Sequence, residues 1–204
     1  MEDVLSEYEQ PYNPEEPRIC FDEKPYQLLE HVQAPLLLAP GKNRRQDYHY
    51  IRKGTCQILC AVEPKGGRRL VEVTEQKTRI DYAKFIKSLV DSYPEAKIIH
   101  LVQDNYSTHS GGSFYEAFDS VTARKLMEKI RFHYTPVKAS WLNMAEIELS
   151  CLSKNCLDQR LGSIEEVTKH LLVRVERRNT EKATIDWQFS VNKARKKFKN
   201  HYKN

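Results

Sequence analysis

The sequence contains no apolar run that approaches the roughly 20 residues needed to cross a membrane. The longest candidate, Ala34–Ala39, is short and contains a proline. The first ten residues, MEDVLSEYEQ, are acidic and lack the basic and apolar regions of a signal peptide. We therefore expect a protein that stays in the cytoplasm.

Cysteine is scarce, and its spacing is unlike that of a zinc site. The five cysteines cannot all pair within one chain because their number is odd. Cys56 and Cys60 have three residues between them, Cys151 and Cys156 have four, and no histidine pair is suitably spaced. We expect reduced, buried thiols and neither a disulfide framework nor a structural zinc site.

Three common catalytic motifs are also missing. The chain has no glycine-rich loop that could cradle a phosphate, no His-Glu-x-x-His pair and no serine in a nucleophile elbow. These absences argue against a P-loop nucleotidase, a zinc protease and an α/β-hydrolase. With 40% hydrophobic and 30% charged residues, the 204-residue chain is typical of one globular domain with a small appendage.

The net charge of +5 is distributed unevenly. Acids predominate in residues 1–30, whereas residues 191–204 contain lysine and arginine but no acid. Further basic clusters occur at Lys42–Arg45 and at Arg68–Arg69. This asymmetry favours a polyanionic partner, although a solvated basic tail explains it equally well.

The pattern of apolar residues predicts an α/β fold. Residues 1–17 contain three prolines and read as an extended lead-in, with a short helical turn before it as an open alternative. A short strand, Arg18–Phe21, ends at Asp22, and a hairpin follows. Helices and strands alternate after the hairpin, so we expect a mixed sheet flanked by helices. The expected elements are the hairpin strands Tyr48–Val62 and Arg69–Thr74, the strands Lys97–Gln103 and Ile130–Tyr134, and the helices Asp81–Ser92, Ser113–Lys129, Leu142–Leu157 and Ile164–Arg178.

Three acids are placed where such a sheet builds a site. Asp22 and Asp104 each follow a predicted strand, and Glu146 begins a helix. Three converging carboxylates repel one another unless a cation neutralises them, and their hard oxygens suit Mg²⁺ or Mn²⁺. Two such ions can activate a water or 3′-hydroxyl and stabilise the leaving oxygen of a phosphodiester. Taken singly, each acid is equally typical of a turn or a helix start.

The residues around these acids occur in four blocks: Cys20–Lys24, Gln103–His109, Phe132–Pro136 and Ser140–Glu148. In this order, from about residue 1 to about residue 180, the blocks resemble the DDE endonuclease domain of bacterial insertion-sequence transposases in the mariner superfamily. The resemblance implies a ribonuclease H-like fold. It also implies Mg²⁺- or Mn²⁺-dependent cleavage and strand transfer at the ends of a mobile element. The metal ligands that it implies, for two ions, are Asp22, Asp104 and Glu146.

Neighbouring acids are left out of this ligand set. Glu148 is two residues along a helix from Glu146, and Glu23 alternates to the side of its strand opposite Asp22. Residues that could support the site are Asn105, Thr108, His109 and Asn143, although each also suits a turn. Residues that could contact DNA are Arg44, Arg45, Lys138, Trp141 and Lys154, with a core anchor as the alternative for Trp141.

Members of the resembled family normally carry an N-terminal helix-turn-helix region, whereas only Met1–Pro17 precedes the first block. We therefore expect a catalytic domain at residues 18–180, a basic tail at 181–204 and base recognition by a separate helix-turn-helix polypeptide. The DNA-bound form is expected to be a homodimer. Two alternatives stay open: a catalytically silent remnant that binds DNA non-specifically, and a nuclease of the same fold that acts on RNA or RNA–DNA hybrids.

Overall fold

The computed structural model describes residues 1–33, 41 and 48–201. A five-stranded mixed sheet forms its centre, with the strand order β3-β2-β1-β4-β5. β2 is antiparallel to both β1 and β3, whereas β1, β4 and β5 are mutually parallel. The strands are β1 (Arg18–His31), β2 (Tyr50–Glu63), β3 (Arg68–Thr74), β4 (Ile99–Gln103) and β5 (Ile130–Tyr134). The predicted mixed sheet with flanking helices is confirmed.

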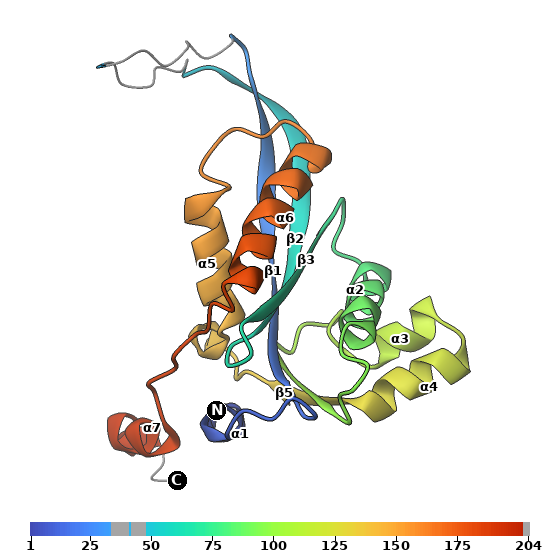
Figure 1. Ribbon diagram of the computed structural model, residues 1–204, viewed down its shortest axis with the longest axis vertical. Coiled ribbons are helices and arrows are strands. Elements are labelled where there is room, and N and C mark those ends of the chain that lie inside the picture. Colours follow the sequence, from blue (N-terminus) through green and yellow to red (C-terminus); the bar gives the residue numbers. More distant parts are fainter. Residues whose placement is uncertain (34–40, 42–47, 202–204) are drawn as a thin grey trace.

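Helices cover both faces of this sheet (Figure 1). The helices are α1 (Glu2–Glu9), α2 (Arg79–Asp91), α3 (Gly112–Ala117), α4 (Ser120–Lys129), α5 (Ala145–Asn155), α6 (Ile164–Thr180) and α7 (Val191–Lys197), with short 3₁₀ turns η1 (Ser140–Leu142) and η2 (Lys199–His201). One core packs α2, α3 and α4 on the sheet, and a second packs α5 and α6 on the other face. Strand alternation explains the division, since Ile19 and Phe21 belong to the first core while Cys20 faces α1. No helix among the described residues is long and apolar enough to cross a bilayer.

β1 is longer than the sequence indicated. The predicted strand ended at Asp22, but β1 continues to His31, and Asp22 pairs with Cys60 of β2. This extension is charged and contains Pro25, so its strand character comes from pairing with β2, which is buried from Cys56 onward apart from the half-buried Gln57. Pairing with β4 stops at Cys20, which leaves one edge of the extension open, and proline is tolerated at such an edge.

The segment Ser113–Lys129, predicted as one helix, forms two. α3 ends at Ala117 and is followed by Phe118, whose backbone is extended, and Asp119 then caps α4 by accepting the N–H groups of Val121 and Thr122. An aspartate at this position stabilises a new helix start and so favours the break.

The lead-in begins with a helix, α1, which is longer than the short helical turn that the sequence left open. In α1, Val4, Leu5 and Tyr8 are buried against Cys20, Val62 and Leu142. The C-terminal helix α7 packs beside α1 at the same end of the molecule (Figure 1). Both terminal segments therefore contribute to one apolar cluster on the sheet.

A buried ion cluster joins α5, α6 and β3. The carboxylate of Glu148 is fully buried and accepts two hydrogen bonds from Arg178, at 2.8 and 2.9 Å. Arg69 Nε lies 2.9 Å from Glu148 Oε2 as an ion pair without hydrogen-bond geometry. Glu148 thus fixes the helix on which Glu146 lies.

Replacing Glu148 by glutamine leaves two arginine charges against a neutral amide. Because a buried charge without its partner is strongly destabilising, Glu148→Gln should lower the free energy of unfolding by about 3–5 kcal/mol. Denaturant unfolding followed by circular dichroism measures this change. Glu176→Gln, an exposed substitution on α6, is the matched control and should leave stability unchanged. Equal stability of the two variants would contradict the structural role of Glu148.

Candidate active site

Asp22 and Asp104 come together where β1 and β4 stop pairing. The last parallel pair between these strands is Cys20 with Val102. Each aspartate lies two residues beyond its member of this pair. Because parallel strands advance in step, the two aspartates reach the same level of the sheet. Asp22 therefore lies inside a long strand, yet at the carboxyl end of its parallel part.

Glu146 approaches the same place from the first turn of α5. The pKa of Asp22 is raised to about 7, first of all by burial and in addition by the negative charges of Glu23, Glu146 and Asp104. The backbone N–H of Glu23, 2.8 Å from Asp22 Oδ1, opposes this rise in pKa. The three acids selected from the sequence are thus electrostatically coupled neighbours.

Asn143 connects the strand of the first acid to the helix of the third. Its side chain is buried, and its Nδ2 donates a hydrogen bond to the carbonyl oxygen of Phe21 at 2.7 Å. Its Oδ1 accepts the backbone N–H of Ala145 at 3.1 Å. Each partner immediately precedes an acid in the sequence. Asn143 therefore holds the backbones of Asp22 and Glu146 at a fixed separation.

His109 supports Asp104 from the other side of the sheet. Its Nδ1 is hydrogen-bonded to Asp104 Oδ1, and its Nε2 lies 2.9 Å from Glu23 Oε2. Burial opposes protonation, but the hydrogen bonds and charges of Asp104 and Glu23 raise the pKa of His109 to about 9. Burial would raise the pKa of Asp104, but His109 lowers it below its ordinary value. His109 is therefore an imidazolium at neutral pH that fixes the Asp104 carboxylate.

Sequence reasoning missed the residues behind His109. Tyr82 donates a hydrogen bond to Gln103 Oε1 at 2.8 Å, and Gln103 Nε2 donates one to the backbone oxygen of His109 at 2.9 Å. Lys77 forms an ion pair with Glu23. As strand alternation predicted, Glu23 points away from Asp22 and toward His109. Strand alternation was the sequence signal for this contact, because it places Glu23 on the face of the sheet opposite Asp22, where His109 lies.

The remaining residues predicted to support the site or to contact DNA differ in their exposure and contacts. Asn105, Lys138 and Lys154 are exposed, whereas Thr108 is partly buried. Trp141 is 44% exposed, and its ring packs edge-on against Phe189, with centroids 5.6 Å apart. This contact joins Trp141 to the C-terminal segment, whereas its exposure is high for the core anchor that the sequence offered as the alternative. Arg44 and Arg45 lie outside the described residues.

The donor set is one that a hard dication suits. Three carboxylates face one region, and Asp22 has its charged form disfavoured by burial and by its neighbours. Among the described residues, these acids do not form a group whose oxygens all lie within 4.8 Å of one another. Asp104 is instead turned toward His109. Mutual repulsion explains the separation, and a cation among the acids would offset it.

The ion pairs of His109 predict a pH-dependent stability. Unfolded histidine has a pKa of about 6.5. A folded pKa of about 9 stabilises the protein fully below pH ~6.5, and this contribution is lost as the pH rises through 9. The stability of the parent relative to His109→Gln should therefore fall by about 3 kcal/mol between pH 6.5 and 9. Thermal unfolding of both proteins across this range measures the difference, and a constant difference would contradict the imidazolium assignment.

The charged form of Asp22 destabilises the folded protein, whereas the charged form of His109 stabilises it. A carboxyl whose folded pKa is raised destabilises the protein increasingly as the pH rises from about 4 through about 7. In metal-free buffer at pH 8, Asp22→Asn should therefore stabilise the protein by on the order of 2 kcal/mol, after discounting for solvent screening. The gain should vanish near pH 4. Asp158→Asn, an exposed substitution, is the control, and a less stable Asp22→Asn protein would refute the proposed repulsion.

Two comparisons relate this site to known proteins. The model of the DDE superfamily endonuclease family matches residues 17–168. The crystal structure of the Mos1 strand transfer complex is similar, with a TM-score of 0.53, 12% identity, and coverage of 90% of this chain and 59% of that chain. The Mos1 mariner paired end complex with Mn has a TM-score of 0.52, 13% identity, and coverage of 90% and 60%. No curated protein matches the chain.

The chain spans about 60% of the length of these Mos1 chains. Identities this low show the fold alone, and the ribonuclease H-like fold expected from the sequence is confirmed. The family match covers well over half of the chain and includes Asp22, Asp104 and Glu146. On this evidence, the chain belongs to the DDE superfamily endonuclease family.

Proposed function

We propose that this chain is the catalytic domain of a DNA transposase, which cleaves phosphodiester bonds and transfers strands at the ends of a mobile element. The observation that carries the proposal is the placement of Asp22 and Asp104 just beyond the last β1–β4 pair, with Glu146 electrostatically coupled to Asp22. Membership of the DDE superfamily endonuclease family and similarity to Mos1 complexes support it. The proposed catalytic domain spans residues 18–180.

The proposed cofactor is Mg²⁺ or Mn²⁺, as two ions held by Asp22, Asp104 and Glu146. When bound, such ions activate the attacking water or 3′-hydroxyl and stabilise the leaving oxygen. Asp22 supports this assignment because its pKa of about 7 reflects burial of the carboxyl and, in addition, the negative charges of Glu23, Glu146 and Asp104. The Mos1 paired end complex with Mn is a further parallel.

The chain's own residues prepare this site in two ways. The imidazolium of His109 fixes the orientation of Asp104 and leaves the other carboxylate oxygen free of that hydrogen bond. Asn143 sets the position of α5 relative to β1 and hence of Glu146 relative to Asp22. Both are positioning residues, since each acts through an acid. Preorganisation of this kind reduces the rearrangement needed when substrate binds.

DNA is the proposed substrate, and its contacts would be electrostatic. Lys138 lies in the loop between β5 and α5, and Lys154 lies on the exposed side of α5. Both flank the helix that carries Glu146, so we assign them to the phosphate backbone. Such contacts carry no base specificity. A homodimer and a separate helix-turn-helix polypeptide remain our proposals for pairing and recognising element ends.

Nicking of supercoiled plasmid DNA tests the proposed activity. The parent should nick DNA in Mg²⁺ or Mn²⁺ and not in EDTA. Asp22→Asn, Asp104→Asn and Glu146→Gln should each abolish nicking, because removing any of the three charges weakens the metal site. Asp158→Asn is the matched control and should retain full activity. Agarose gels quantify the open-circular product.

Other outcomes distinguish the alternatives. Salt-sensitive DNA binding without nicking in either metal would identify a catalytically silent remnant. Faster cleavage of an RNA–DNA hybrid than of DNA would reassign the substrate. Three acid variants that cut as well as the parent would reject the proposed site. Calorimetric titration of Mg²⁺ and Mn²⁺ into the parent and Asp104→Asn, with and without a short duplex, tests metal binding separately from turnover.

A further inference from the structure

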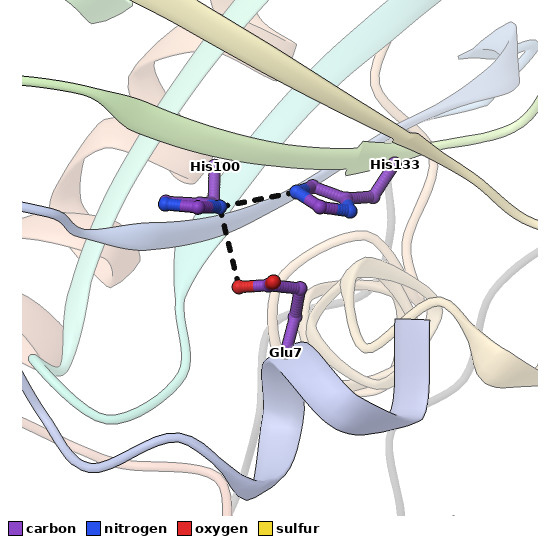
Figure 2. Close-up of side chains that lie close together, drawn as sticks. All are labelled: Glu7, His100 and His133. Carbon is purple, nitrogen blue, oxygen red and sulfur yellow. Dashed lines mark hydrogen bonds and ion pairs between the residues drawn. The ribbon is translucent and has the colours of Figure 1, made fainter. Parts of the chain in front are cut away.

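A second group of potential metal ligands lies between α1 and the sheet. Glu7 comes from α1, His100 from β4 and His133 from β5, and their side chains point toward one another (Figure 2). Among the described residues, this is the group of three or more potential ligands whose donor atoms all lie within 4.8 Å of one another. The ligands are far apart in the sequence, so residue spacing alone gave no signal for them.

The separations between the donor atoms match those around a tetrahedral ion. His100 Nδ1 lies 3.1 Å from His133 Nε2 and 3.2 Å from Glu7 Oε2. Two ligands about 2.0–2.1 Å from a tetrahedral ion lie roughly 3.3 Å apart. Both histidines are buried, and the Glu7 side chain is 16% exposed. Only small shifts would be needed to admit an ion among the three atoms.

A fourth residue orients one of the histidines. Asp3 Oδ2 lies 2.9 Å from His133 Nδ1. Because a carboxylate accepts hydrogen bonds, this contact places a proton on Nδ1 and leaves the lone pair of Nε2 directed at His100. A carboxylate on the remote nitrogen is the usual second partner of a metal-bound histidine.

Without a cation, three electron-rich atoms face one another here. The lone pair of His133 Nε2 and the Glu7 carboxylate both point at His100 Nδ1. A single proton on His100 Nδ1 can be shared in hydrogen bonds with His133 Nε2 and Glu7 Oε2, and a metal ion can replace that proton.

The cluster is separate from the three acids of the proposed catalytic site. His100 precedes Asp104 by four residues of strand, which is roughly 13 Å. Its chemistry also differs, because imidazole nitrogens suit Zn²⁺ or Co²⁺, whereas an all-carboxylate set suits Mg²⁺. A cavity of about 490 Å³, lined by Glu7, Tyr8, Arg18 and Trp187 among others, adjoins the cluster at Glu7.

We propose that Glu7, His100 and His133 form a transition-metal site, with Zn²⁺ as the preferred ion and Asp3 as the residue that orients His133. Arg18 Nε, 3.0 Å from Glu7 Oε2, partly neutralises the carboxylate and would give way to the ion. Bound metal connects α1 to β4 and β5. The site is structural, and it tightens the packing of the N-terminal helix on the sheet that carries Asp104.

Cobalt titration of the full chain tests this site. The Asp104→Asn variant serves as the background, because it weakens the proposed catalytic site and leaves the second cluster intact. One equivalent of Co²⁺ should give the visible ligand-field absorption of a tetrahedral nitrogen-containing site, and Zn²⁺ should displace it. Adding His100→Gln or His133→Gln should weaken Co²⁺ binding at least tenfold. Adding His170→Gln, on α6, is the matched histidine control and should change nothing.

Two further variants guard against simple misfolding. Glu7→Gln removes a ligand charge from a largely buried helix position, and Asp3→Asn alters only the exposed partner of His133. Asp3→Asn should weaken Co²⁺ binding about 10–100-fold while circular dichroism stays unchanged. Zn²⁺ should raise the Tm of the parent and not that of Glu7→Gln.

Absence of the cobalt spectrum in the parent would overturn the proposal and leave a shared proton as the occupant of the cluster. The same would follow from a spectrum that survives in His133→Gln. Neither result bears on DNA nicking, which is measured on the parent in Mg²⁺ or Mn²⁺. Failure of the metal site and failure of the proposed function are therefore distinguishable.

Discussion

Negative charge accumulates where β1 and β4 stop pairing, and much of the surrounding structure serves to hold it there. Asp22 and Asp104 reach this level together because parallel strands advance in step. Their carboxylates would separate if they were mobile, since burial strengthens the repulsion between them. The fold therefore needs rigid supports: His109 holds Asp104, and Asn143 holds the backbones of Asp22 and Glu146.

Those supports come from distinct parts of the chain. Asp104 is held by His109, whose protonation depends on two acids and which is itself backed by Gln103. Glu146 is held through Asn143 at one end of α5, while Glu148 fixes the same helix to Arg69 and Arg178. Neighbouring acids on one helix thus have different environments. Glu146 is partly exposed and coupled to Asp22, whereas Glu148 is fully buried and compensated by arginine.

The N-terminal helix α1 forms a second group of charged contacts with the same sheet. α1 buries three apolar side chains and also brings Glu7 and Asp3 to the histidines of β4 and β5. Apolar packing alone would fix this helix only loosely in rotation about its axis. The directional contacts with His100 and His133 specify which carboxylates face the sheet. A metal ion bound at the proposed site would fix the orientation of α1 on the sheet still more firmly.

The sequence by itself determined the mixed sheet, the hairpin and a buried strand, predicted as Lys97–Gln103 and observed as Ile99–Gln103, because hydrophobic period is a local property. Strand-end polarity selected the three acids as candidates for the site. Tertiary structure decided the rest. The charged half of β1 is a strand only because β2 pairs with it, and α1 is a helix on the sheet because its apolar side chains find Cys20 and Leu142. The contacts of His109 with Glu23, of Asn143 with Phe21 and of Glu7 with the two histidines join residues that are far apart in the chain. Such contacts depend on folded geometry, which residue type and spacing do not encode.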